Sequence, residues 1–227
     1  MDRLNSLQVM SPSAGVFIAV AVGFPQPEQR HIGMVYRAQE TAVPRFLHLA
    51  WHFDLRDEEL DDRYFWIEVN IHEKRARQVA AQCRQVLLGN PDGLPYAFSY
   101  PNKCFDSVTG AFLFGPTKLG LTCATFVLAV FESSGFPLAR VNTWPDRPED
   151  EVWRQHVIDL MTKSNVPQQH IDQVKSAKAA FRVRPEEVAA AAILAPPEAA
   201  FDAVVVDLAK KVLDALTAAS SARTVTH

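Results

Sequence analysis

The stretch HIGMVYRAQETAVPRFLHLA, residues 31–50, contains two short apolar runs, and each run carries one histidine. His31 opens the first run, and Gly33 follows two residues later on the same face of an extended chain. His48 lies near the middle of the second run, which begins after Pro44. Facing side chains on adjacent antiparallel strands lie about 5 Å apart. The stretch therefore predicts two paired strands that bring His31 and His48 side by side.

Apolar runs on both sides extend this strand pattern into an antiparallel sheet. Residues 15–24 form one such run, and residues 64–71 alternate apolar and polar side chains along the chain. We interpret residues 45–55 as a single strand. The acidic segment 57–62 that follows is interpreted as an exposed turn.

Helix signals follow the strands. Residues 72–88 carry apolar side chains at helical spacing and end before a Gly-Asn-Pro sequence. A second helix is predicted after Thr122, a favourable N-cap residue, with Cys123 at its first position. Gly135 is the expected end of this helix.

The composition changes after residue 144, where alanine becomes frequent. We predict a main domain over residues 1–144 and a helical C-terminal appendage over residues 145–227 that contains no catalytic group. The helices expected in the appendage span residues 149–162, 168–180, 185–194 and 201–219. The apolar stripe expected on the last helix consists of Val204, Leu208, Val212 and Leu216.

Composition and charge indicate an ordinary globular protein. Of the 227 residues, 48% are hydrophobic and 22% are charged. The net charge of -3 provides no strong basic field that would draw the protein to nucleic acid or to an anionic membrane surface, and we expect no nucleic acid as a partner. No apolar run approaches the length of about 20 residues that a membrane helix needs, and we expect no integral membrane segment. Three cysteines without paired spacing favour reduced thiols and a cytoplasmic protein.

The chemistry of the chain centres on Cys123. At the first position of a helix, unpaired backbone N–H groups and the helix dipole favour a thiolate, so we expect a lowered thiol pKa. A thiolate beside a histidine is the arrangement that thiol hydrolases use to attack a carbonyl carbon. The alternative is that Cys123 is a small apolar residue that only packs in the core.

Three segments of the chain resemble one family. His31-Ile-Gly-Met-Val-Tyr36, Phe46-Leu-His48-Leu-Ala50 and Thr122-Cys123-Ala-Thr-Phe126 look like the permuted NlpC-like proteins, which include the lecithin:retinol acyltransferase-type enzymes. In that family a histidine starts a short strand, a polar residue lies on the next strand, and the cysteine follows at a helix start. Ordinary papain-like enzymes have the cysteine first.

The resemblance covers roughly residues 15–135 and implies an α+β fold. Residues 1–144 would then form a permuted papain-like (NlpC-like) catalytic domain. It also implies Cys123 as nucleophile, His31 as base and His48 as the group that orients the base. The family often has an Asn-Cys pair, whereas Thr122 precedes the cysteine here.

Two other residues compete for a role in the site. The connection 37–45 is longer than a tight hairpin, which weakens the case for His48 as the group that orients the base. Glu68, on the polar face of the run 64–71, is the alternative for this role. His48 and His52 have the spacing of a zinc pair on a helix, but on a strand four residues separate them by about 13 Å. We therefore expect no metal site and no cofactor.

The sequence predicts a thiol hydrolase or acyltransferase that acts on an amide, ester or thioester bond of a peptide, amide or acyl substrate. The alternative is a catalytically inactive binding module of the same fold, which uses the C-terminal helices to bind a protein partner. A lipid enzyme bound to a membrane surface is a third possibility. It is disfavoured because no basic amphipathic helix is present.

Overall fold

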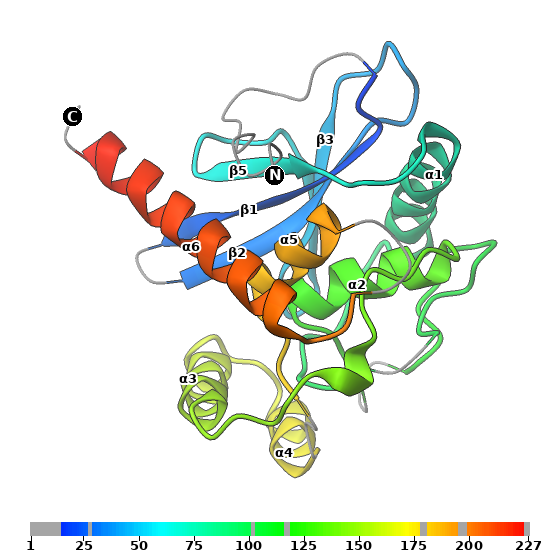
Figure 1. Ribbon diagram of the computed structural model, residues 1–227. Helices are drawn as coiled ribbons and strands as arrows, with labels where there is room; N and C mark the ends of the chain where they lie inside the picture. The colour runs from blue at the N-terminus through cyan, green and yellow to red at the C-terminus, as the bar shows by residue number, and fades with distance from the viewer. Residues whose placement is uncertain are drawn as a thin grey trace.

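The computed structural model describes residues 15–26, 29–100, 103–115, 119–177, 181–194 and 199–224. This part of the protein is an α+β structure with a five-stranded sheet in the order β4-β3-β2-β1-β5 (Figure 1). All four strand pairs are antiparallel, as the sequence predicts. The strands are β1 (Ile18–Gln26), β2 (Gln29–Tyr36), β3 (Arg45–Trp51), β4 (Asp54–Glu58) and β5 (Tyr64–Glu68).

The helices predicted from the sequence are all present. They are α1 (Glu73–Gly89), α2 (Cys123–Ser133), α3 (Asp150–Lys163), α4 (Gln168–Ser176), α5 (Pro185–Ile193) and α6 (Ala203–Thr224), and a short 3-10 turn, η2 (Val141–Thr143), precedes α3. The helix predicted over 168–180 ends at Ser176, and residues 178–180 lie outside the described residues. Among the described helices, none is long and apolar enough to cross a membrane.

The sheet separates two hydrophobic clusters. On one face, alternate strand residues such as Val20, Met34 and Leu47 belong to the main core, together with apolar side chains of the helices. Helix α2 packs against β2 and β3, and α5 packs against β1 and β5 (Figure 1). The opposite face carries a smaller cluster that includes Val35 and Phe46. The side-chain alternation of the strands therefore assigns each residue to one of two distinct environments.

The interpretation of residues 45–55 as a single strand is wrong. The chain turns back after Trp51, and β4 pairs with β3 in an antiparallel hairpin. Phe53 in this turn has a φ of 54°, a left-handed conformation that glycine or asparagine usually adopts. Glu58, placed by the sequence in an exposed turn, belongs to β4 instead. The hairpin was missed because neither glycine nor proline marks the turn.

The C-terminal helices share the main core with the sheet. The backbone N–H of Asn70 donates to the carbonyl of Ala192 in α5 at 3.1 Å, and Trp144 Nε1 donates to Glu187 at 2.9 Å. Side chains from both sides of residue 144 form one continuous cluster. The division of the chain at residue 144 stays a prediction, and the described helices beyond it are packed directly on the rest of the protein.

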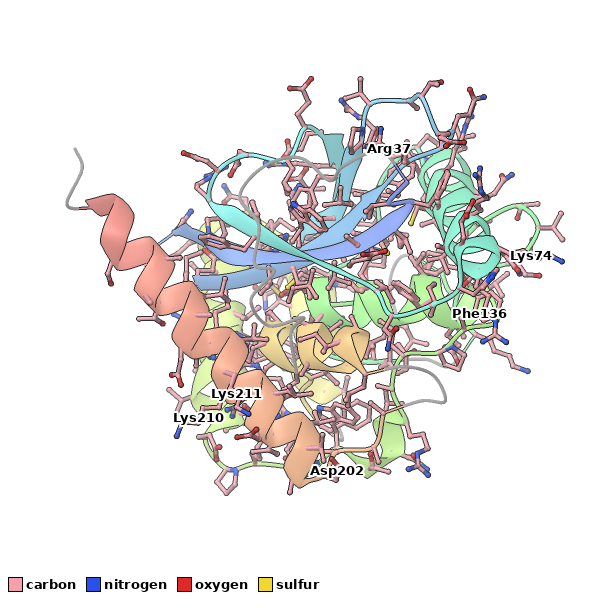
Figure 2. The ribbon with its side chains drawn as sticks, turned by 45° about the horizontal axis from the view of Figure 1, so that its top comes forward. Arg37, Lys74, Phe136, Asp202, Lys210 and Lys211 are labelled. Atoms are coloured by element: carbon pink, nitrogen blue, oxygen red, sulfur yellow. The ribbon has the colours of Figure 1, made fainter. Side chains whose placement is uncertain are left out.

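The buried stripe of α6 differs from the expected one. Asp202 caps the start of the helix by accepting the N–H groups of Val204 and Val205 (Figure 2). Val204 is 55% exposed, and the fully or nearly buried residues are Val205, Ala209, Val212 and Leu216. A constant step of four residues overshoots a helical turn by about 40° each time, so a buried stripe must mix steps of three and four.

Candidate active site

His31 and His48 meet across the adjacent strands β2 and β3. Nε2 of His31 lies 2.8 Å from Nδ1 of His48, and the two rings are in edge-to-face contact. Met34 pairs with Leu47, so in the same antiparallel register the next residue of each strand places Gly33 opposite His48. A Cβ atom on Gly33 would lie 2.6 Å from Cβ of His48, so glycine leaves the space that this imidazole occupies. The structure thus has the side-by-side histidines that the two strands predict.

Glu58 extends the histidine pair to a chain of three polar groups. Its Oε1 lies 3.0 Å from Nε2 of His48. A carboxylate only accepts hydrogen bonds, so Nε2 of His48 carries the proton and donates it to Glu58. Nδ1 of His48 then accepts from Nε2–H of His31. This order leaves the lone pair of His31 on Nδ1, the nitrogen suited to act as a base.

Sequence reasoning missed Glu58 and considered Glu68 instead. Because β4 was read as a turn, no carboxylate was expected on the strand beside His48. Glu68 is exposed and pairs with Ala19, whereas the strand position aligned with His31 through β1 is Tyr64. Four residues along β5 separate Tyr64 from Glu68 by about 13 Å. The structure does not bring Glu68 to the histidines.

Cys123 is the first residue of α2. The helix begins with a capping box, in which the Thr122 side chain accepts the N–H of Thr125 at 3.2 Å and the Thr125 side chain accepts the N–H of Thr122 at 2.8 Å. These two bonds fix the first turn and hence the position of the thiol. The predicted N-cap and first helical residue are confirmed.

An opening in the sheet brings the helix layer to the histidines. The β2–β3 ladder joins Met34–Tyr36 to Arg45–Leu47 and ends there, although β2 begins at Gln29 and β3 continues to Trp51. Helix α2 packs against these two strands, and its first residue, Cys123, is hydrogen-bonded to the backbone N–H of Ile32 in β2. Cys123 and His31 line the same cavity, which has a volume of about 70 Å³. Residues of β2 and the first residue of α2 thereby line one space.

The C-terminal helical part supplies another wall of this cavity. Trp153 and Val157 of α3 line it, together with Arg182 and Pro185 at the start of α5. The sequence assigned no role in the site to residues beyond 144. These residues reach the cavity through tertiary packing, and no local pattern in the sequence indicates such packing.

The resting thiol is protonated, contrary to the expectation from helix position. Burial raises the pKa of Cys123 to about 11, although the N–H groups of Ile32 and Ala124 act in the opposite direction. Burial, with the neighbouring His48, lowers the pKa of His31 to about 3. Desolvation of the charged form outweighs the helix terminus here. The resting pair is therefore a neutral thiol and a neutral imidazole.

His48 and His52 do not form a common site. His48 faces His31, whereas Nδ1 of His52 accepts the N–H of Tyr96 at 3.2 Å and its ring contacts His170. Within the described ranges, no three His, Cys, Asp or Glu side chains are grouped as metal ligands.

Comparisons of the chain with protein-family models, with curated proteins and with solved structures found no match. The functional assignment therefore depends on the geometry of the site.

Proposed function

We propose that the protein is a thiol hydrolase or acyltransferase with a permuted papain-like (NlpC-like) fold, which acts on an amide, ester or thioester bond. The observation that carries the proposal is the Glu58–His48–His31 chain, which ends at the cavity that Cys123 lines. A nucleophile, a base and a group that orients the base are the parts that covalent acyl transfer needs.

In this mechanism His31 acts as general base during the attack. Its Nδ1 takes the thiol proton while the sulfur of Cys123 bonds to the substrate carbonyl carbon. Hydrogen bonding through His48 to the Glu58 carboxylate stabilises the imidazolium that forms. The same proton then passes to the leaving amine, alcohol or thiol, and an acyl-enzyme thioester remains. Water or a second acceptor releases the acyl group, again with His31 as base.

The raised thiol pKa favours this sequence of events over a preformed ion pair. With the pKa of Cys123 at about 11 and that of His31 at about 3, proton transfer in the free enzyme is uphill. The transfer therefore accompanies bond formation, when the negative charge moves from sulfur to the carbonyl oxygen.

The test is labelling of the full-length protein with electrophilic acyl probes, read by mass spectrometry on each cysteine peptide. We expect acylation of Cys123 and its loss in Cys123→Ala, whereas the Cys104→Ala control retains it. His31→Ala should abolish turnover, and His48→Ala should reduce it less, because His48 acts only through His31. An unlabelled Cys123 would overturn the proposal.

A catalytically inactive binding module is the second candidate. The observation that favours it is the burial of Cys123, which is 7% exposed and has a protonated thiol. In that case the protein would bind a partner with this fold, and the thiol would react no faster than other buried cysteines. The same labelling experiment separates the two candidates.

A further inference from the structure

The cavity beside Cys123 has a cationic lining. Arg30 lines it from β2, and Arg182 lines it from the segment before α5. Among the described residues that form its wall, none is aspartate or glutamate. The other polar side chains there are uncharged or histidine, and Trp51 and Trp153 provide apolar surface. A wall of this kind complements an anion rather than a cation.

The two arginines differ in the arrangement of their counter-ions. Nη1 of Arg30 lies 2.5 Å from a carboxylate oxygen of Glu186, which gives Arg30 a counter-ion of its own. Nη1 of Arg182 lies 3.2 Å from Asp150, and that carboxylate also accepts from Arg147 and Arg184. Arg147 also pairs with Glu187 and Arg184 with Glu149, so Arg182 belongs to a network of three guanidinium groups and three carboxylates in which its own partner is the shared Asp150.

The surroundings hold the Arg182 guanidinium in place. It lies 3.9 Å from the ring centroid of Trp153, in a cation–π arrangement, and its side chain is 15% exposed. A guanidinium has five N–H donors, and within the described residues Asp150 is its hydrogen-bond acceptor. Burial raises the pKa of Cys123, and the charge of Arg182 counteracts this, so the two groups are within electrostatic reach.

We propose that Arg182 binds a carboxylate of the substrate, so that Cys123 acts on acyl compounds that carry a negative charge close to the scissile carbonyl. This inference rests on the proposed function and adds the substrate class. A planar guanidinium pairs with a carboxylate through two parallel hydrogen bonds.

Two alkylating reagents test this without a known substrate. Iodoacetate and iodoacetamide have nearly the same size, and only the first carries a carboxylate. The rate ratio of iodoacetate to iodoacetamide is measured at Cys123 in the full-length protein and at a free thiol in the same buffer. Because both rates are taken at one thiol, its pKa cancels in the ratio. We expect the ratio at Cys123 to exceed that of the free thiol about tenfold, on the scale of a charge-assisted hydrogen bond.

Variants assign the preference to one side chain. Arg182→Gln should reduce the ratio to the value of the free thiol, and Arg182→Lys should retain part of it. Arg184→Gln is the matched control, because Arg184 also bonds Asp150 but does not line the cavity. It should change the ratio much less than Arg182→Gln does.

The possible failures are distinguishable. A wild-type ratio equal to that of the free thiol, with acyl-probe labelling of Cys123 intact, overturns the carboxylate subsite and leaves the proposed function standing. This comparison needs no variant, so a poorly folded Arg182→Gln protein does not obscure it. A Cys123 that neither reagent nor any acyl probe modifies overturns the proposed function, and the inference with it.

Discussion

Each ring nitrogen of His48 has one partner, and this arrangement determines the protonation of His31. Glu58 accepts from Nε2 of His48, so Nδ1 of His48 must accept from His31. Burial lowers the pKa of His48, and this effect is larger than the opposite effect of the hydrogen bond to Glu58. The ring therefore stays neutral. In the proposed mechanism the carboxylate therefore acts through two imidazoles, as an orienting group.

Replacement of Glu58 by glutamine tests this orientation. An amide can donate to Nε2 of His48, which would move the proton to Nδ1 and reverse the order of donors up to His31. We expect Glu58→Gln to lower kcat about tenfold to hundredfold, the scale of a lost charge-assisted hydrogen bond. Glu68→Gln is the matched control and should leave kcat within about twofold of wild type. A larger loss in Glu68→Gln than in Glu58→Gln would contradict the assignment.

Burial of His31 also makes folding stability depend on pH. Its pKa falls from about 6.5 in the unfolded chain to about 3 in the folded protein. Between these values only the unfolded chain binds the proton, so stability that is present above about pH 6.5 is lost as the pH falls. Urea unfolding at pH 7, 5.5 and 4.5 should show a smaller loss in His31→Gln than in wild type, by up to about 1.4 kcal/mol per pH unit. Equal slopes in both proteins would indicate that the ring is not buried in its neutral form.

At the scale of the elements, local signals predicted most of the boundaries. Thr122 and the apolar run that follows it located α2, because capping and helical periodicity act within one or two turns. The β3–β4 hairpin was not predicted because Phe53, which is neither glycine nor asparagine, adopts the left-handed conformation in its turn. For the same reason Glu58, a polar group of the site that lies on this hairpin, was not predicted. The end of the β2–β3 pairing, where residues far apart in sequence meet, leaves no periodic pattern in the sequence and could not be predicted from it.

Gly33 links the geometry of the strands to that of the site. Its added Cβ would meet Cβ of His48, the Phe46 ring and the Leu47 carbonyl at 2.6 to 2.7 Å. We expect Gly33→Ala to lower the free energy of unfolding by about 1–3 kcal/mol, as overpacking does, and to reduce turnover by displacing His48. Gly115→Ala, where nothing lies within 4 Å of the added carbon, is the control and should be close to neutral in urea unfolding. An unchanged Gly33→Ala protein would mean that the strands separate easily at this point.

At the scale of the whole molecule, the C-terminal helices complete both the core and the site. Ala189, Ala190 and Ala192 of α5 are almost fully buried against the sheet and α2. Small side chains allow the helix to approach the strands closely, which explains why alanine becomes frequent in this part of the chain. Helix α6 then covers α5 (Figure 1). The cavity and the core thus include residues that the sequence grouped into a separate appendage.

Truncation tests whether the two parts of the chain fold independently. A chain that ends at Pro145 loses α5 and with it the apolar cover of β1 and β5. Each Å² of apolar surface exposed costs about 25 cal/mol, and the usual total stability of a protein is 5–15 kcal/mol. Exposing a few hundred Å² of the core by removing a helix therefore costs about as much as the whole stability. We expect this chain to show no cooperative thermal transition by circular dichroism. A chain that ends at Leu216 retains the buried residues of α6 up to that position and should melt within a few degrees of wild type. A cooperative transition in the shorter chain would show that residues 1–144 form an autonomous domain, as the composition of the sequence predicts.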